Sequence, residues 1–230
     1  MIIICPNTGD ECDKHIQYIP KSAFLITAYL NKNEGFYEEI TKIEETLRSI
    51  LKRNDFSLEI AKDKFTTGNM LCKICAYIQA TSFSLALYTS KTPKRSVPNI
   101  FYEIGIAQTF GKSVYLMGGK KIKRPSDLGG LEWVKFDDIN DLDQKFEDIF
   151  NKVNQKSKYY NTIGNLKFNA KNYGEAFWYY KTAYLLNPTD EIKNTIIKIN
   201  EKLNSLNNTN NMDISLQREI DSITKFLAFI

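Results

Sequence analysis

Short apolar runs and longer amphipathic stretches alternate along residues 22–152. The apolar runs occupy residues 23–27, 57–61, 83–88, 113–117 and 133–136, and each has the length of a β-strand. Such alternation predicts strands that are joined by crossover helices into a mostly parallel sheet, with helices on its faces. Residues 83–88 carry almost no polar side chain, which is expected of a central strand covered on both faces.

The stretches between the strands have the spacing of amphipathic helices. Apolar residues recur every three or four positions within 36–50, and the glutamates between them are expected to form a solvated face: Glu38, Glu39, Glu44 and Glu45. A second helix is predicted for residues 69–78. A third begins near Pro98, whose fixed φ suits a first helical turn, and ends at Gly111, a residue type favoured just past a helix end. Apolar residues within 142–150 mark a closing helix.

From about residue 159 the strand patterns stop and only helical spacing remains. A set of positions carries the residue types of a tetratricopeptide repeat, in which small residues let two antiparallel helices approach and aromatic residues fill the gap. These positions are Tyr160, Ile163, Gly164, Tyr173, Ala176, Tyr180, Ala183 and Pro188. A further helix is predicted for 190–203. Because a solenoid needs about three repeats to bury its faces, a single repeat is expected to pack on the first domain or on another chain.

The end of the chain has a different composition. Residues 205–213 are polar and rich in Asn, and we interpret them as a linker. Apolar residues within 214–227 return to helical spacing, and they indicate either a packed last helix or a helix that binds a partner. The chain is therefore divided into a cysteine-containing segment (1–21), an α/β domain (22–152), repeat-like helices (153–204) and a linker with a C-terminal helix (205–230).

The composition excludes several classes of protein. Hydrophobic residues make up 43% of the 230 residues and aromatic residues 13%, which excludes a disordered chain. The net charge is only +4, and the excess is spread over both predicted domains, whereas a nucleic-acid binder gathers its basic residues on one surface. The apolar start at residues 1–4 is far shorter than the roughly 20 residues of a spanning helix. A cytoplasmic protein that binds neither nucleic acid nor membranes is expected.

Four cysteines in a chain without a recognisable leader indicate a reducing compartment, where thiols stay free or bind metal. Cys5, Cys12 and His15 lie within eleven residues around a Pro/Gly turn, and they are either three ligands of a structural zinc ion or ordinary turn residues. No fourth ligand is evident nearby. Cys72 and Cys75 have a metal-ligand spacing but lie in the second predicted helix, where we interpret them as core thiols. No cofactor is predicted to be required.

Residues 98–107 are the strongest candidate for chemistry. Ligands of an open α/β sheet bind beyond the carboxyl ends of the strands, so the start of this helix is expected near a site. Asn99 and Glu103 are four residues apart and therefore project from the same side of the first turns. Gly105 is expected to permit a close approach to the sheet. The Glu103 carboxylate either acts on a ligand or interacts favourably with the helix macrodipole.

Three elements within residues 22–118 combine into a pattern. They are the polar turn at 26–29 after the first strand, Asp63 with the small-residue turn after the second strand, and the signature Asn-x-x-Tyr-Glu-x-Gly-x-Ala…Gly-Lys that begins at Asn99. With these elements the chain resembles the nucleoside 2-deoxyribosyltransferase-like and TIR-like superfamily. The resemblance implies a flavodoxin-like sheet, and it implies that Glu103 is the catalytic residue.

The resemblance also implies roles for other residues around a nucleotide. Glu103 would stabilise the oxocarbenium-like centre that forms when the bond between base and sugar breaks, or would capture it as a glycosyl ester. Asn99 and Tyr102 would orient sugar hydroxyls or Glu103 itself, and Asp63 would hydrogen-bond the base or ribose. The phosphate or base side of the site would be formed by the turn residues Thr27, Ala28 and Tyr29.

The end of the central strand departs from the family pattern. Family members often carry an aspartate there, whereas this chain has Tyr88 and Thr89, and the departure weakens the expectation of transferase chemistry. Tyr88 remains a candidate ligand-binding residue. A basic loop follows, with Lys91, Lys94 and Arg95, and it either favours a phosphorylated ligand or is simply solvated.

These observations predict a cytoplasmic nucleotide N-glycosidase, either an NAD-cleaving enzyme or a nucleoside-monophosphate hydrolase. The repeat-like helices and the C-terminal helix would bind a protein partner or mediate self-association, and the combination resembles bacterial immune effectors that act in anti-phage defence. Two alternatives remain: a sensor that binds a nucleotide signal without cleaving it, and a scaffold with a vestigial site. Glu103 discriminates between enzyme and sensor, because a sensor has no need of a catalytic carboxylate.

Overall fold

The computed structural model describes residues 5, 16–30, 32–63, 69–119, 128, 130–209 and 214–230. The chain forms two compact units. One comprises the described residues of Lys21–Asn151, and the other comprises those of Lys152–Ile230 together with residues 16–20. No helix in the described part of the chain is both long and apolar enough to span a membrane.

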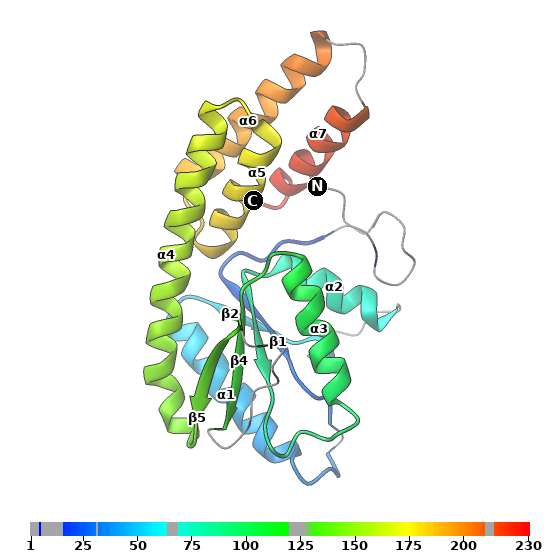
Figure 1. Ribbon diagram of the computed structural model, residues 1–230, viewed down its shortest axis with the longest axis vertical. Helices are drawn as coiled ribbons and strands as arrows, with labels where there is room; N and C mark the ends of the chain where they lie inside the picture. The colour runs from blue at the N-terminus through cyan, green and yellow to red at the C-terminus, as the bar shows by residue number, and fades with distance from the viewer. Residues whose placement is uncertain are drawn as a thin grey trace. The chain divides into compact units, whose positions relative to one another are not determined.

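A five-stranded parallel sheet forms the centre of the first unit (Figure 1). The strands lie in the order β2-β1-β3-β4-β5. Their bounds are β1 Ser22–Ile26, β2 Ser57–Glu59, β3 Phe83–Leu87, β4 Val114–Gly119 and β5 Glu132–Phe136. β1 pairs with β3, and every residue of both strands is buried. The prediction of an α/β fold with a mostly parallel sheet is confirmed, and the strand order is that of flavodoxin-like sheets.

The strands of this unit are connected by helices with identifiable ends. The helices are α1 Tyr37–Arg53, α2 Met70–Ala80, α3 Val97–Thr109 and α4 Leu142–Asn169, with the short 3-10 turns η1 Ala61–Asp63 and η3 Ile139–Asp141. Asn69 caps α2, since its side-chain oxygen accepts from the Leu71 N–H at 2.8 Å. Gly111 follows α3 with a φ of 68°, which glycine adopts without steric cost. β2 is two residues shorter than predicted because the chain turns into η1 at Ala61.

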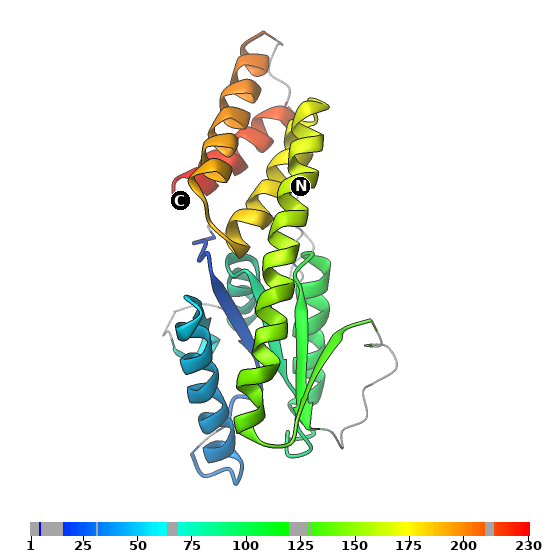
Figure 2. The ribbon, with the colours of Figure 1, turned by 90° about the vertical axis from the view of Figure 1, so that its left-hand side faces the viewer.

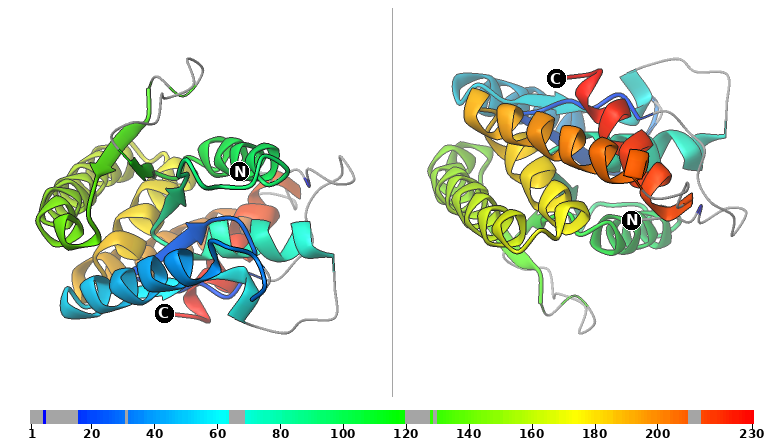
Figure 3. Two further views of the ribbon diagram at one scale, coloured as in Figure 1. Left: turned by 90° about the horizontal axis from the view of Figure 1, so that it is seen from below. Right: turned by 90° about the horizontal axis from the view of Figure 1, so that it is seen from above.

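The helices cover both faces of the sheet (Figure 3). α2 packs beside α3 on one face, where Tyr77 stacks on Phe24 with ring centroids 5.7 Å apart. The first part of α4 lies on the opposite face, where Phe83 and Phe150 both contact Phe56. α1 lies on that face too, since an ion pair joins its last residue to the start of α4. This double cover accounts for the apolar composition of β1 and β3.

The predicted solvated face of α1 is correct only in part. Glu38 and Glu45 are exposed, as expected. Glu44 is buried, at 6% exposure, because Lys62 neutralises its carboxylate at 2.6 Å. Helical spacing locates a side chain around the helix axis, but it does not show whether a distant segment of the chain covers it.

The regular structure in the described residues of the second unit is helical. The later part of α4 continues into it without a break (Figure 2), so the closing helix and the first repeat-like helix are one helix. It is followed by α5 Tyr173–Leu186, α6 Asp190–Thr209 and α7 Ile214–Leu227. α6 runs through residues 205–209, where a linker was predicted. The side-chain amide of Asn207 donates to Gln217 of α7 at 2.9 Å and supports this extension.

Close packing of small residues on aromatic rings holds this unit together. A Cβ added at Gly164 of α4 would lie 3.2 Å from the ring of Tyr180 in α5, and the Tyr180 hydroxyl donates to Asn165 at 2.8 Å. α7 contributes Ile223 and Phe226, both fully buried, to the same core. Of the two interpretations of the C-terminal residues, the structure therefore has the packed last helix. The assignment to the tetratricopeptide family stays a prediction.

Tyr18 belongs to the helical unit. Its ring lies 4.9 Å from that of Phe226, and its hydroxyl oxygen lies 2.8 Å from the Lys181 ammonium, which donates to it. The same ammonium stands 4.5 Å from the centre of the Tyr18 ring, an arrangement that favours a cation. The residues just before β1 therefore contribute to the core of the second unit.

Replacement of Gly164 by leucine is expected to lower the free energy of unfolding by about 1–3 kcal/mol, because the Tyr180 ring is buried and has no room to move. The same change at Gly105 of α3 meets open space and is expected to be neutral or slightly stabilising. Urea titration of both variants measures the difference. Equal stability of the two variants would contradict this packing.

Candidate functional site

The strand order creates a switch point between β1 and β3. The chain leaves β1 toward β2 on one side and reaches β3 on the other, so the connections that follow these two strands diverge at the carboxyl edge of the sheet. Residues 27–29 follow β1, residues 88–96 follow β3, and α3 begins directly after the second connection. Ligands of such sheets bind at this point, so these segments delimit the candidate site.

Glu103 is a buried carboxyl group on the sheet-facing side of α3. Its residue exposure is 5%, and α3 contacts β1, β3 and β4. Ile100, Ile104 and Ala107 surround it on the same helix, each at 1% exposure or less. Within the described residues the buried Oε2 atom has no hydrogen-bond partner. Burial raises the pKa of Glu103 from an ordinary 4.5 to about 7.

The macrodipole interpretation of Glu103 does not agree with its position. Glu103 is the seventh residue of α3, which begins at Val97. The favourable effect of a helix N-terminus on a carboxylate is largely confined to the first turn. A buried carboxyl group without a full set of hydrogen bonds lowers the stability of the fold, and groups of this kind concentrate at functional sites.

The turn after β1 brings further polar groups to the switch point. Thr27 is 3% exposed, and its Oγ1 atom is buried without a hydrogen-bond partner in the described part of the chain. Ala28 is 6% exposed, and the hydroxyl oxygen of Tyr29 is buried. Tyr88 is half-buried after β3, and its ring meets that of Phe101 of α3 edge-on at 5.4 Å. These residues share the carboxyl edge with the start of α3.

Asn99 and Tyr102 differ from Glu103 in exposure. Asn99 lies one turn before Glu103 on the same flank of α3 and is exposed, so this flank runs from solvent to the buried carboxyl group. Tyr102 is 49% exposed and points away from the sheet, because consecutive helical residues diverge by about 100°. The expectation that Tyr102 orients Glu103 has no support in this geometry. The close approach expected at Gly105 is wrong, since nothing lies within 4 Å of a Cβ built there.

Two of the predicted elements have no described side chains, or only some of them. They are Asp63 with the turn that follows it, and the set of Cys5, Cys12 and His15. Asp63 ends η1, directly after β2, and its side chain and the turn that follows are not among the described parts. Cys12 and His15 also lie outside the described residues. Elsewhere in the described chain no group of three or more His, Cys, Asp or Glu side chains could hold a metal ion. Cys72 is half-buried and Cys75 is 7% exposed in α2, in keeping with core thiols.

Ser84 is a buried polar residue that the sequence pattern did not single out. It is fully buried in β3, and its Oγ atom has no hydrogen-bond partner among the residues described. Its register with Phe24 places it on the sheet face that α2 and α3 cover. A hydroxyl residue in an otherwise apolar central strand is the signal that could have identified it.

The basic loop after β3 is paired with acidic residues of the connection after β1. Lys91 contacts the carboxylate of Glu39 at 2.5 Å, and Arg95 contacts that of Glu34. Lys91 also stands 5.5 Å from the centre of the Phe36 ring. Lys94 is the cation of this loop that has no partner among the described residues. The charge that was expected to favour a phosphate is therefore largely neutralised, and the ion pairs tie the two connections together.

No protein-family model matches the sequence, and no curated protein matches it. The structure is similar to that of a CMP N-glycosidase from Clostridium botulinum, with 16% identity, a TM-score of 0.43, and coverage of 55% of this chain and 98% of that chain. It is also similar to a 2-deoxyribosyltransferase from Bacillus psychrosaccharolyticus, with 14% identity, a TM-score of 0.40, and coverage of 53% and 90%. At these identities and scores neither similarity assigns an activity to this chain.

The raised pKa of Glu103 predicts a pH-dependent loss of stability. The folded protein binds this proton more tightly than the unfolded chain, so stability falls as pH rises from about 4.5 to about 7 and then levels off. Glu103→Gln removes the titration. We expect the free-energy difference between wild type and variant to change by about 2–3 kcal/mol between about pH 5 and about pH 8 in favour of the variant. Urea unfolding at both values measures it, and parallel pH profiles would contradict the burial of an ionisable Glu103.

Proposed function

We propose that the chain is a hydrolase that cleaves the N-glycosidic bond of a nucleotide, with Glu103 as its catalytic carboxylate. The observation that supports the proposal most strongly is the buried Glu103 carboxyl group, whose Oε2 atom lacks a hydrogen-bond partner among the described residues. It belongs to the helix that follows the switch point, where ligands of such sheets bind. A carboxylate that the fold leaves unsatisfied is available to a developing positive charge.

The proposed reaction needs one ionised carboxylate. As the bond between C1′ and the base breaks, the base leaves with the bonding electrons and the sugar ring develops oxocarbenium character. The Glu103 carboxylate stabilises this centre or bonds to C1′ as a glycosyl ester, which water then hydrolyses to the free sugar. A departing purine or pyrimidine takes up a proton, whereas the nicotinamide of NAD leaves neutral without one. Asn99, on the exposed part of the same flank, is proposed to hydrogen-bond a sugar hydroxyl.

The ligand side of the site is proposed to be the turn after β1. The Thr27 hydroxyl, which has no hydrogen-bond partner among the described residues, is proposed to donate to a phosphate or a base, with Ala28 and Tyr29 as further proposed contacts. Lys94 adds an available positive charge across the switch point. A phosphorylated substrate is therefore proposed over a free nucleoside. Asp63 and Tyr88 remain proposed contacts of the base or ribose.

One observation favours a second candidate function, a nucleotide sensor. A pKa of about 7 leaves roughly half of Glu103 protonated at neutral pH. A protonated carboxyl group donates a hydrogen bond to a ligand without any bond cleavage. Tight nucleotide binding without turnover would favour this function.

The second unit is proposed to bind a protein partner or a second copy of the chain. Tyr159 and Leu166 of α4 are each 60% exposed, and their spacing of seven residues puts them on one face of the helix. Beside them Tyr160 packs edge-on against Trp178 at 6.1 Å. Exposed apolar groups of this kind support an interaction surface. A regulated role in bacterial anti-phage defence in the cytoplasm stays a prediction.

Turnover is tested by incubating the protein with NAD, nucleoside monophosphates and free nucleosides, and by following the released base by chromatography. Base release is expected from a phosphorylated substrate. Glu103→Gln should lower kcat/KM by at least about 100-fold, because the transition-state charge loses its carboxylate. The exposed Glu147→Gln on α4 is the matched control and should keep wild-type rates. Undiminished turnover by Glu103→Gln would contradict the proposal.

The pH profile distinguishes the role of the carboxylate. If Glu103 acts ionised, kcat/KM rises about tenfold per pH unit and levels off above about pH 7, where the carboxyl group has lost its proton. A general acid would give the opposite slope. The profile is measured on the wild-type protein with its best substrate, and a rate that falls with rising pH would contradict the nucleophilic or electrostatic role.

A further inference from the structure

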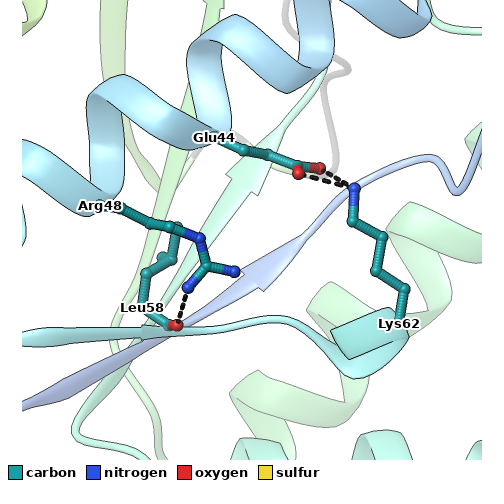
Figure 4. A network of polar contacts seen from close by, with 4 residues as sticks. All are labelled: Glu44, Arg48, Leu58 and Lys62. Carbon is teal, nitrogen blue, oxygen red and sulfur yellow. Dashed lines mark hydrogen bonds and ion pairs between the residues drawn. The ribbon is translucent and has the colours of Figure 1, made fainter. Parts of the chain in front are cut away.

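An ion pair between a buried carboxylate and a partly exposed ammonium joins α1 to the segment that follows β2 (Figure 4). Both carboxylate oxygens of Glu44 accept hydrogen bonds from the Lys62 ammonium of η1, at 2.7 and 2.6 Å. The Glu44 side chain is 7% exposed and that of Lys62 is 37% exposed. One turn further along α1, Arg48 donates to the main-chain oxygen of Leu58 in β2 at 3.0 Å. Two polar side chains of α1 thus hold the same short piece of chain.

Stability alone does not account for a buried carboxylate at this position. Removing the Glu44 charge from water costs several kcal/mol, and well-packed apolar residues of similar volume often serve a fold as well or better. An ion pair with two short hydrogen bonds holds its two partners in a defined position, because its geometry tolerates little displacement. The partners of Glu44 and Arg48 lie in η1 and β2, so these two side chains position the end of β2 and the turn η1.

This turn has few other restraints from the sheet. β2 has three residues, lies at the edge of the sheet and pairs only with β1. The pairing ends at Phe24↔Glu59, so the residues after Glu59 have no ladder hydrogen bonds to β1. η1 contacts α2. Because β2 runs parallel to β1, η1, which ends at Asp63, follows the carboxyl end of β2.

We propose that Glu44 and Lys62 are positioning residues, which fix η1 at the carboxyl edge of the sheet and thereby set how tightly the site binds its nucleotide. The inference rests on the proposed function for the identity of the ligand. Neither residue touches the substrate: Glu44 acts through Lys62, and Lys62 acts through the backbone of the turn that it belongs to.

Hydrogen exchange and kinetics together test the pair. In Glu44→Gln the neutral amide offers one acceptor oxygen in place of two charged ones and attracts the ammonium less, so the backbone amides of residues 60–63 should exchange faster than in wild type. KM, or the dissociation constant of a nucleoside monophosphate, should rise roughly tenfold with kcat within about twofold, because the reacting groups on α3 stay in place. Lys62→Met should reproduce both effects. Glu45→Gln, the exposed neighbour on α1, is the matched control and should change neither.

The double variant Glu44→Leu with Lys62→Met separates positioning from stability. It replaces the pair by apolar side chains and should regain the wild-type melting temperature while KM stays high. Recovery of KM together with the melting temperature would overturn the proposal. Unchanged exchange at residues 60–63 in Glu44→Gln would overturn it as well. Because exchange needs no substrate, it decides the positioning role even if no nucleotide is cleaved or bound and the proposed function fails.

Discussion

The parallel pairing of β1 with β3 is the constraint on which the rest of the first unit depends. Both strands are buried along their whole length, from Ala23↔Phe83 to Ile26↔Ala86, and helices cover both faces. In such a sheet a polar group inside a strand is costly, since the strand interior offers no water, and polar groups are therefore expected mainly where a strand ends. The strand order reverses between these two strands, so the connections that leave their carboxyl ends run in opposite directions and leave room for polar groups between them.

Glu103, like Ser84, departs from this separation of polar from apolar groups. It lies in the middle of α3 at 5% exposure, next to the buried Ile104, and its burial raises its pKa to about 7. Burial of the Glu103 carboxyl group lowers the stability of the fold, and it also brings the protonation equilibrium of this group into the physiological pH range. Elsewhere in the unit, the ion pairs of Lys91 with Glu39 and of Arg95 with Glu34 tie the connection after β3 to the one after β1, and the pair of Glu44 with Lys62 ties η1 to α1.

Much of this fold was predictable because its causes are local. The apolar strands, the end of α3 just before Gly111 and the paired spacing of Gly164 and Tyr180 all follow from side chains near one another in sequence. What required the structure depends on distant segments. Helical spacing does not reveal that Lys62 covers Glu44, that Glu39 meets Lys91 across 52 residues, or that Tyr18 packs on Phe226. Glu103 was predicted as the functional carboxylate, whereas its degree of burial and the Ser84 hydroxyl, which has no hydrogen-bond partner among the described residues, were not.

The central claim is that the buried carboxyl group of Glu103 meets the anomeric carbon of a nucleotide. A crystal structure of the wild-type protein with a carbocyclic nucleoside monophosphate tests it most directly, because the carbocycle lacks the ring oxygen that stabilises the cation and is not cleaved. The account predicts the base and ring between the turn after β1 and the start of α3, with a Glu103 carboxylate oxygen within about 3.5 Å of the carbon that bears the base. An analogue bound elsewhere, or bound there with Glu103 still enclosed by Ile100 and Ile104, would contradict it.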